Sequence, residues 1–179
     1  EIAAIRRVKT KEEIELHRKA CKITELGVKN ILANLKPDMH EYEAEAYFDF
    51  TLKSNNARHA FTTIAGSAEN ACSMHYDKND RLMKDGDMIL FDLGAEWGYY
   101  AADVSRTYPV NSRFTEQQKT LYNIVLKGLE SAIAAAKPGQ PKEELQTLSK
   151  NVMAEELIKI GMIEKPEEIN KYYFHGSGH

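Results

Sequence analysis

Asp92 and Asp103 are the residues whose type and spacing best suit chemistry. Both lie in stretches typical of β-strands, and Trp97-Gly98 between them can form a tight turn. A hairpin centred on that turn would set Asp92 directly opposite Asp103, with Cβ atoms about 4.5–5.5 Å apart. Two carboxylates at that separation repel each other unless a proton or a cation lies between them. A hard divalent cation, which prefers oxygen ligands, therefore suits the pair.

Apolar residues alternate with Asp92 along the predicted strand 88–95, so the aspartate faces away from the apolar side. On the returning strand it would share its face with Ser105 and Thr107. An aspartate within such a strand is costly unless it is paired or bound to a metal. A structural interpretation stays open, in which one aspartate marks a strand end and the other pairs with Arg106 or a nearby lysine.

His175 and His179 are further candidate ligands, because they bracket Gly176-Ser177-Gly178. Glycines let the backbone approach a ligand closely. A structural role for either histidine is the alternative. His75 stands alone in its segment and would be interpreted as a loop histidine. The remaining histidines are interpreted as surface or capping residues: His17, His40 and His59.

Helices are predicted before and after the strands, which favours an α+β fold over a doubly wound parallel sheet. Thr10 and Glu13 form a predicted capping box, and Thr115 is a predicted N-cap. The expected helices run from residue 10 to Pro37, from 41 to about 53 with Tyr42, Ala46, Phe50 and Leu52 inward, from 115 to about 136, and from 143 to about 160. The expected strands cover residues 61–65, 88–95, 99–110 and 172–174.

Composition limits the function classes. The 179 residues, of which 42% are hydrophobic and 28% charged, fit one domain or part of a larger one and argue against wholesale disorder. No uncharged apolar run approaches the length of a membrane span. A net charge of −3 gives no basic footprint for nucleic acid, so neither nucleic acid nor membrane is an expected partner. Cys21 and Cys72 suit a reducing compartment, and we expect a cytoplasmic protein in which both are inert buried thiols.

Three ordered segments resemble the pita-bread metallopeptidases, and within them the proline-specific branch of Xaa-Pro aminopeptidase and Xaa-Pro dipeptidase. They are Phe91–Ala95, Ala102–Thr107 and His175–His179, and Met74-His75-Tyr76 matches the substrate-side histidine of the family. The resemblance covers essentially the whole chain. It implies a partial pita-bread fold, in which helices cover a sheet that contains an antiparallel hairpin. It also implies a metal-dependent exopeptidase that releases the N-terminal residue from peptides with proline at the second position.

The resemblance also implies a role for each candidate residue. Asp92 would chelate one metal, Asp103 would bridge two, and His179 would bind the second. His75 would be the hydrogen-bond donor and proton shuttle beside the scissile bond, and His175 would line the substrate pocket near the carbonyl oxygen. The implied cofactors are two divalent ions, Mn²⁺ above all, with a bridging hydroxide that attacks the Xaa-Pro bond.

In the family, a further histidine and two glutamate ligands follow the second histidine, whereas this sequence stops at His179. We therefore expect residues 1–179 to be the N-terminal portion of a catalytic domain whose C-terminal half is missing. Residues 1–9 would be the joint from a missing N-terminal domain. This chain alone is expected to be inactive, and the full-length protein to be a homo-oligomer.

The alternatives within the family are Xaa-Pro dipeptidase, methionine aminopeptidase and creatine hydrolase. The alternative from another class is a non-catalytic pita-bread module that binds proteins. Such modules lose the metal ligands, whereas Asp92, Asp103 and His179 are all retained here. The sequence therefore favours the peptidase.

Overall fold

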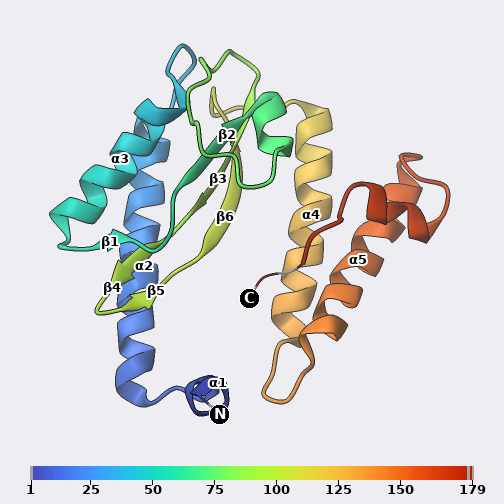
Figure 1. The fold of residues 1–179 in the computed structure, drawn as a ribbon. Helices are drawn as coiled ribbons and strands as arrows, with labels where there is room; N and C mark the ends of the chain where they lie inside the picture. Colours follow the sequence, from blue (N-terminus) through green and yellow to red (C-terminus); the bar gives the residue numbers. More distant parts are fainter. Residues whose placement is uncertain (1, 177, 179) are drawn as a thin grey trace. The chain divides into compact units, whose positions relative to one another are not determined.

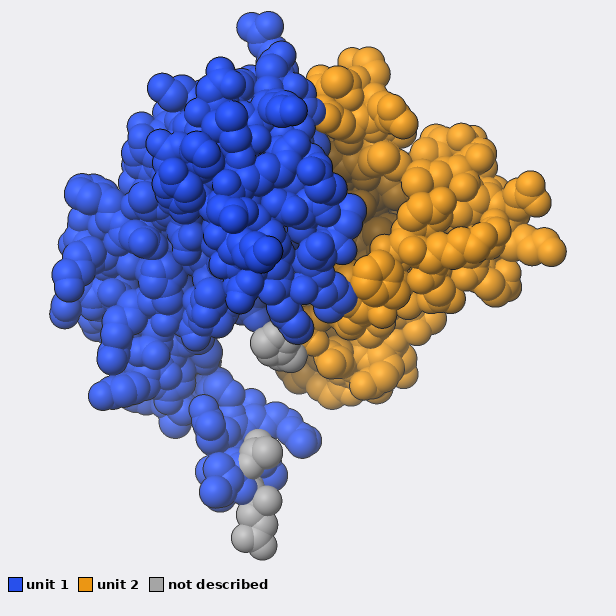
Figure 2. All heavy atoms as spheres, turned by 45° about the horizontal axis from the view of Figure 1, so that its top comes forward, with its two compact units in different colours: residues 1–113 blue, residues 114–179 orange. Residues whose placement is uncertain are grey.

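The computed structural model describes residues 2–176 and residue 178. The chain forms two compact units, residues 1–113 (unit 1) and residues 114–179 (unit 2), which Figure 2 colours separately. Unit 1 contains α1 (Ile2–Arg7), α2 (Lys11–Asn34), α3 (Glu41–Ser54), β1 (Arg58–His59), β2 (Ile64–Ser67), the 3-10 helix η1 (Ala68–Cys72), β3 (Met88–Leu93), β4 (Ala95–Trp97), β5 (Tyr100–Ala101) and β6 (Val104–Pro109) (Figure 1). Unit 2 contains α4 (Glu116–Ala135), α5 (Lys142–Lys159) and the 3-10 helix η2 (Pro166–Lys171).

Both predicted helix caps are confirmed. The Thr10 hydroxyl accepts a hydrogen bond from the Glu13 N–H at 3.3 Å, and the Glu13 carboxylate accepts one from the Thr10 N–H at 2.6 Å. Thr115 and Gln118 form the same reciprocal pair at the start of α4. Each box satisfies backbone donors that the first turn of a helix leaves without partners.

The strands form two antiparallel sheets of three strands, ordered β2-β3-β6 and β1-β4-β5. Sequence patterns predict one continuous hairpin over residues 88–110, but its ladder is broken where β3 passes into β4 and β5 into β6. At this break the chains approach so closely that a Cβ atom on Gly94 would lie 1.8 Å from the Ala102 carbonyl oxygen. A glycine is therefore required at the crossing.

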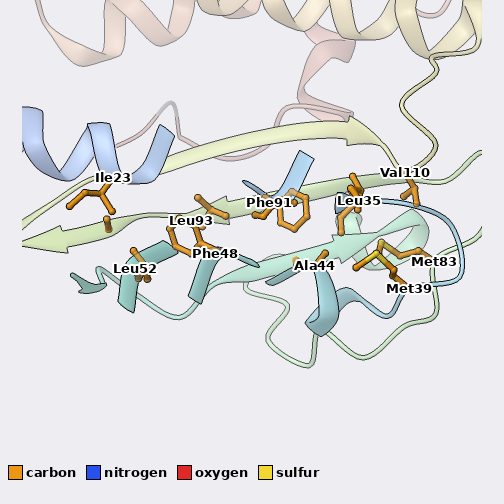
Figure 3. Close-up of a cluster of buried hydrophobic side chains, with 14 residues drawn as sticks. Ile23, Leu35, Met39, Ala44, Phe48, Leu52, Met83, Phe91, Leu93 and Val110 are labelled. Atoms are coloured by element: carbon orange, nitrogen blue, oxygen red, sulfur yellow. The ribbon is translucent and has the colours of Figure 1, made fainter. Parts of the chain in front are cut away.

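The core of unit 1 lies between the α2–α3 pair and one face of the β2-β3-β6 sheet. Ile89, Phe91 and Leu93 are buried along β3 and alternate with half-buried residues, as their spacing predicts. Figure 3 shows Phe91 and Leu93 gathered with Phe48 of α3 in one continuous apolar layer. Residues on the opposite face of β3, Asp92 among them, do not belong to this core.

The inward face of α3 is only partly the one expected, because Leu52 is buried as predicted whereas Ala46 is exposed. Tyr42 and Phe50 are 52% and 68% exposed, whereas Ala44 and Phe48 are fully buried. Glu41, the first residue of the helix, is itself 0% exposed, and the positions three and seven residues after it share its face. The rotation of α3 therefore follows a buried polar residue that an apolar pattern cannot reveal.

Unit 2 is an α4–α5 pair followed by η2. Its smaller apolar cluster consists of Ile124, Met153, Ala154, Leu157, Ile163 and Ile169. The strand expected over residues 172–174 is wrong: η2 ends at Lys171, and Tyr173 packs against the cluster without strand pairing. The strand expected over residues 61–65 begins later, at Ile64. The expected burial of Cys21 and Cys72 is also wrong, because both are exposed. These differences leave the expected α+β class intact, and no described helix is long and apolar enough to span a membrane.

Candidate metal centre

Asp92 lies in the middle of the β2-β3-β6 sheet. It is half-buried, opposite Ile64 of β2 on one side and Ser105 of β6 on the other. The Ser105 hydroxyl donates a hydrogen bond to Asp92 Oδ1 at 2.8 Å. Because directly paired residues share a face, Asp92 and Ser105 both point away from the apolar core. One neighbouring strand therefore orients this carboxylate.

The direct pairing of Asp92 with Asp103 is wrong. The turn is centred on Gly98-Tyr99, since Trp97 pairs with Tyr100, and this places Ser105 opposite Asp92. Gly98 and Tyr99 have φ values of 61° and 67°, the signature of a type I′ hairpin turn. Sequence patterns predict a turn at Trp97-Gly98 and not at Gly98-Tyr99, because tyrosine rarely adopts a left-handed conformation.

A register displaced by two residues preserves the faces, because side chains alternate with a period of two. Asp103 lies two residues before Ser105, in the short segment between β5 and β6. Its predecessor Ala102 is 3% exposed, whereas Asp103 is exposed, so burial alternates through the break. Asp103 thus follows the alternation of Ser105, next to the strand that carries Asp92.

His75 lies in the loop between η1 and β3. It is exposed and has a φ of 55°, which is uncommon for a residue other than glycine. The adjacent Tyr76 hydroxyl lies 2.7 Å from a carboxylate oxygen of Glu41, and burial together with this hydrogen bond raises the pKa of Tyr76 to about 12. Sequence patterns missed Glu41, because a glutamate in the first turn of a helix normally only complements the helix dipole.

Two further ionisable groups lie near the same loop. Burial raises the pKa of Glu45, which accepts a hydrogen bond from Asn79 Nδ2 at 2.8 Å. Burial also tends to raise the pKa of Asp87. Hydrogen bonds from the Arg81 guanidinium, 2.6 Å away, and from the Lys84 N–H outweigh it and lower the pKa of Asp87. Charge-assisted contacts therefore hold the end of the loop that leads into β3.

His175 lies in unit 2, after η2. Its ring is in edge contact with those of Tyr173 and Phe174, and its carbonyl oxygen accepts a hydrogen bond from Gln146 Nε2 at 3.2 Å. His179 lies outside the described residues. The structure thus places Asp92 on β3 and Asp103 directly before the neighbouring β6, both in unit 1, and describes His175 within unit 2.

The chemistry of the donors fits a hard divalent cation, because Asp92 and Asp103 both offer carboxylate oxygens. The set is partial, however. Among residues 2–176 and 178, no group of three or more histidine, cysteine, aspartate or glutamate side chains is placed to hold a metal ion. The described residues therefore supply part of a coordination shell.

Comparisons with known proteins find relatives that are similar in sequence and in structure. Residues 15–179 match metallopeptidase family M24. The chain is 36% identical over 160 residues to the Xaa-Pro aminopeptidase of Escherichia coli K12. This matched region covers 89% of this chain and 36% of that protein. It is 35% identical over 169 residues to the Xaa-Pro dipeptidase of Mus musculus, covering 91% of this chain and 34% of the relative.

A solved Bacillus anthracis structure assigned to aminopeptidase P has a TM-score of 0.95 and 46% sequence identity, and the match covers 98% of this chain and 42% of the other. The fold is thus the corresponding part of the pita-bread fold, as the sequence motifs imply. The chain spans about a third of the length of the curated relatives it matches. The match to the family profile covers nearly all of the chain, which therefore belongs to metallopeptidase family M24.

Proposed function

We propose that this chain is the first part of the catalytic domain of a metal-dependent exopeptidase that removes the N-terminal residue from peptides with proline at the second position. The observation that carries the proposal is the placement of Asp92, which Ser105 orients on the side of β3 away from the core, with Asp103 directly before β6. Relatives named Xaa-Pro aminopeptidase and Xaa-Pro dipeptidase support the substrate class.

In this proposal Asp92 and Asp103 would hold two divalent cations between them, Asp103 being shared by both, and His179 would be a further ligand of the second. Two such cations, Mn²⁺ in our proposal, would polarise the scissile carbonyl and activate water near neutral pH. The Ser105 hydroxyl occupies one lone pair of Asp92 Oδ1 and so fixes the direction in which that carboxylate offers its remaining lone pairs. His75 moves the proton at the scissile bond, and His175 contacts the substrate near its carbonyl oxygen.

A proline after the scissile bond makes that bond a tertiary amide without an N–H group. Recognition must then come from the carbonyl oxygen, the free amino terminus and the proline ring. Histidine side chains beside a metal site suit the first of these, because a ring N–H can donate to the carbonyl oxygen. This is the chemical reason to place His75 and His175 on the substrate side.

The domain assignment belongs to the same proposal: residues 1–179 form the N-terminal portion of the catalytic domain, and residues 1–9 join it to a preceding domain. We further propose a cytoplasmic homo-oligomer. Xaa-Pro dipeptidase is the second candidate. The relative with that name is 35% identical, close to the 36% of the Xaa-Pro aminopeptidase relative, so sequence identity supports both activities about equally.

The full-length enzyme should be assayed with Mn²⁺ on Xaa-Pro dipeptides and on longer Xaa-Pro peptides, with Xaa-Ala peptides as the control. Cleavage of longer peptides supports the aminopeptidase, and cleavage of dipeptides alone supports the dipeptidase. No cleavage of either class, in a preparation shown to bind metal, contradicts the proposal. His75→Ala should keep the metal content and lower kcat by about 10²-fold or more, as expected for a residue that moves a proton.

A further inference from the structure

Glu41 is a carboxylate buried at the start of α3, with a side chain that makes long-range contacts. It is 0% exposed, although ionised carboxylates are very rarely buried without compensation. The charge lies at the N-terminal end of α3, where the helix dipole favours it. The burial of this group therefore needs further hydrogen-bond donors.

Those partners all come from one loop. Five groups lie at donor distance from the two carboxylate oxygens: the Ser67 N–H at 2.6 Å, Ser67 Oγ at 2.7 Å, Asn70 Nδ2 at 3.3 Å, Tyr76 Oη at 2.7 Å and the Arg81 N–H at 3.1 Å. The return contact runs from the Glu41 N–H to the Arg81 carbonyl oxygen at 3.0 Å. We name residues 67–81 the anchored loop, because one side chain holds both of its ends and its middle.

The anchored loop carries His75, next to one of the residues that Glu41 holds. Tyr76 Oη is also within 2.8 Å of Asn70 Nδ2, so the two sides of the loop meet at the carboxylate. His75 itself has a left-handed φ of 55°. Such a conformation is unfavourable for histidine and persists where surrounding contacts over-determine it. The hydrogen bonds to Glu41 are contacts of that kind.

A second buried residue fixes the same loop against the sheet. Asn79, 4% exposed, accepts a hydrogen bond from the Ala65 N–H of β2 at 2.9 Å and donates one to the Thr63 carbonyl oxygen at 3.0 Å. Because β2 pairs with β3 through Ile64 and Asp92, the loop and the candidate metal ligand are built on one sheet. Displacement of the loop would change the position of His75 relative to Asp92.

We propose that Glu41 is a positioning residue for the peptidase reaction, which acts by holding the anchored loop so that His75 reaches the scissile bond. This inference rests on the proposed function. Its requirement is an acceptor at both side-chain oxygens of Glu41, because the Ser67 N–H donates to one and the Arg81 N–H to the other. A glutamine at this position would turn an amide N–H₂ towards donors and lose at least one of the contacts.

The first test compares Glu41→Gln with Glu43→Gln in the metal-loaded, full-length enzyme. Glu43 is exposed in the same helical turn and caps α3 through His40, a role that glutamine also performs. We expect Glu41→Gln to lower kcat by about 10- to 100-fold with a smaller change in KM and unchanged metal content, since small misplacements of catalytic groups have effects of this size. Glu43→Gln should retain wild-type kcat.

The second test repeats Glu41→Gln in a His75→Ala background. If Glu41 acts through His75, the second substitution should lower kcat no further, because the group that it positions is gone. A full additional loss of the same factor would show a role elsewhere and overturn the inference. Should Glu41→Gln fail to fold, Tyr76→Phe removes one loop contact and should give a smaller loss of kcat that also vanishes without His75.

The third test does not depend on activity. Hydrogen exchange of residues 67–81 in the full-length enzyme should be faster in Glu41→Gln than in Glu43→Gln, by about tenfold or more for amides whose protection depends on these contacts. Equal exchange in both variants overturns the anchoring. A wild-type enzyme without Xaa-Pro activity overturns the proposed function, whereas an active enzyme with wild-type kcat in Glu41→Gln overturns this inference alone.

Discussion

Different interactions stabilise the interior of unit 1 and that of unit 2. In unit 1 the apolar cluster draws on α2, α3, β2, β3 and β4, and the buried carboxylate of Glu41 links a helix to a loop far along the chain. In unit 2 a smaller cluster joins α4 and α5, and their charged contacts are exposed: Lys127 and Lys159 both contact Glu156. Unit 1 thus adds a buried hydrogen-bonded carboxylate to its apolar core, whereas the ion pairs of α4 and α5 in unit 2 are open to solvent.

The difference matters for the site. A catalytic group must be held to within a fraction of an ångström, which packed strands and buried hydrogen bonds achieve better than flexible surface ion pairs. Asp92, Asp103 and His75 all lie in unit 1. We therefore expect substitutions at these three residues to affect activity strongly, whereas substitutions in unit 2 away from His175 and His179 should mainly change stability.

The largest effect is expected for Asp103→Asn in the full-length enzyme. A bridging carboxylate supplies negative charge to both cations, and asparagine keeps its shape without that charge. Activity on Xaa-Pro peptides should fall below detection, while the thermal unfolding midpoint of the metal-free protein changes little because Asp103 is exposed. Metal analysis should show loss of at least one equivalent. An active variant with a full metal complement would contradict the two-metal assignment.

The next largest effect is expected for Gly94→Ala, which tests how rigidly unit 1 holds the hairpin. The new Cβ would lie 1.8 Å from a backbone oxygen, that of Ala102, and 3.3 Å from the Asp103 nitrogen. Overpacking against side chains costs about 1–3 kcal/mol, and a backbone atom has less freedom to move, so we expect a loss above about 3 kcal/mol. Urea unfolding measures this loss of unfolding free energy. A loss under about 1 kcal/mol would show that the backbone of the hairpin can move to accommodate the new Cβ.

The site face could be predicted from the sequence, whereas the register and the supporting residues could not. Alternation around Asp92 is a local pattern, and it fixed the face correctly even though the turn lies one residue later than expected. The burial of Glu41 depends on hydrogen-bond donors between Ser67 and Arg81. No local periodicity in the sequence connects the start of a helix with a distant loop. The same carboxylate sets the rotation of α3. This is why Phe50 is exposed, although the apolar pattern alone predicts it inside.

Gly128→Ala in unit 2 is the matched substitution for Gly94→Ala, with a smaller expected effect. Its Cβ would lie 2.8 Å from Met153 Cγ and 3.0 Å from Ser149 Oγ, both side-chain atoms. A methionine side chain can move aside, and replacing glycine within a helix contributes about 1 kcal/mol in the opposite direction. The net change in unfolding free energy should stay within about 1 kcal/mol. A loss equal to that of Gly94→Ala would remove the contrast between the units.

The smallest effect is expected when acid removes the charge of Glu156, which lies on α5 in unit 2. The hydrogen bond from Lys127 Nζ at 2.5 Å and then that from Lys159 lower the pKa of Glu156 to about 2. An unfolded glutamate titrates near pH 4.3, so the folded state binds the proton less readily. The resulting stabilisation is present in full above about pH 5 and is lost as the pH falls towards 2.

Glu156→Gln should therefore be slightly less stable than the wild type at pH 7 and equal to it near pH 2, as measured by urea unfolding at low salt. Salt should reduce the difference at pH 7, because the contact is exposed and screened. Glu130→Gln, an exposed change of the same charge on α4, serves as the control and should show no such convergence. A Glu156→Gln difference that persists unchanged at pH 2 would mean that packing, and not charge, joins the two helices at this point.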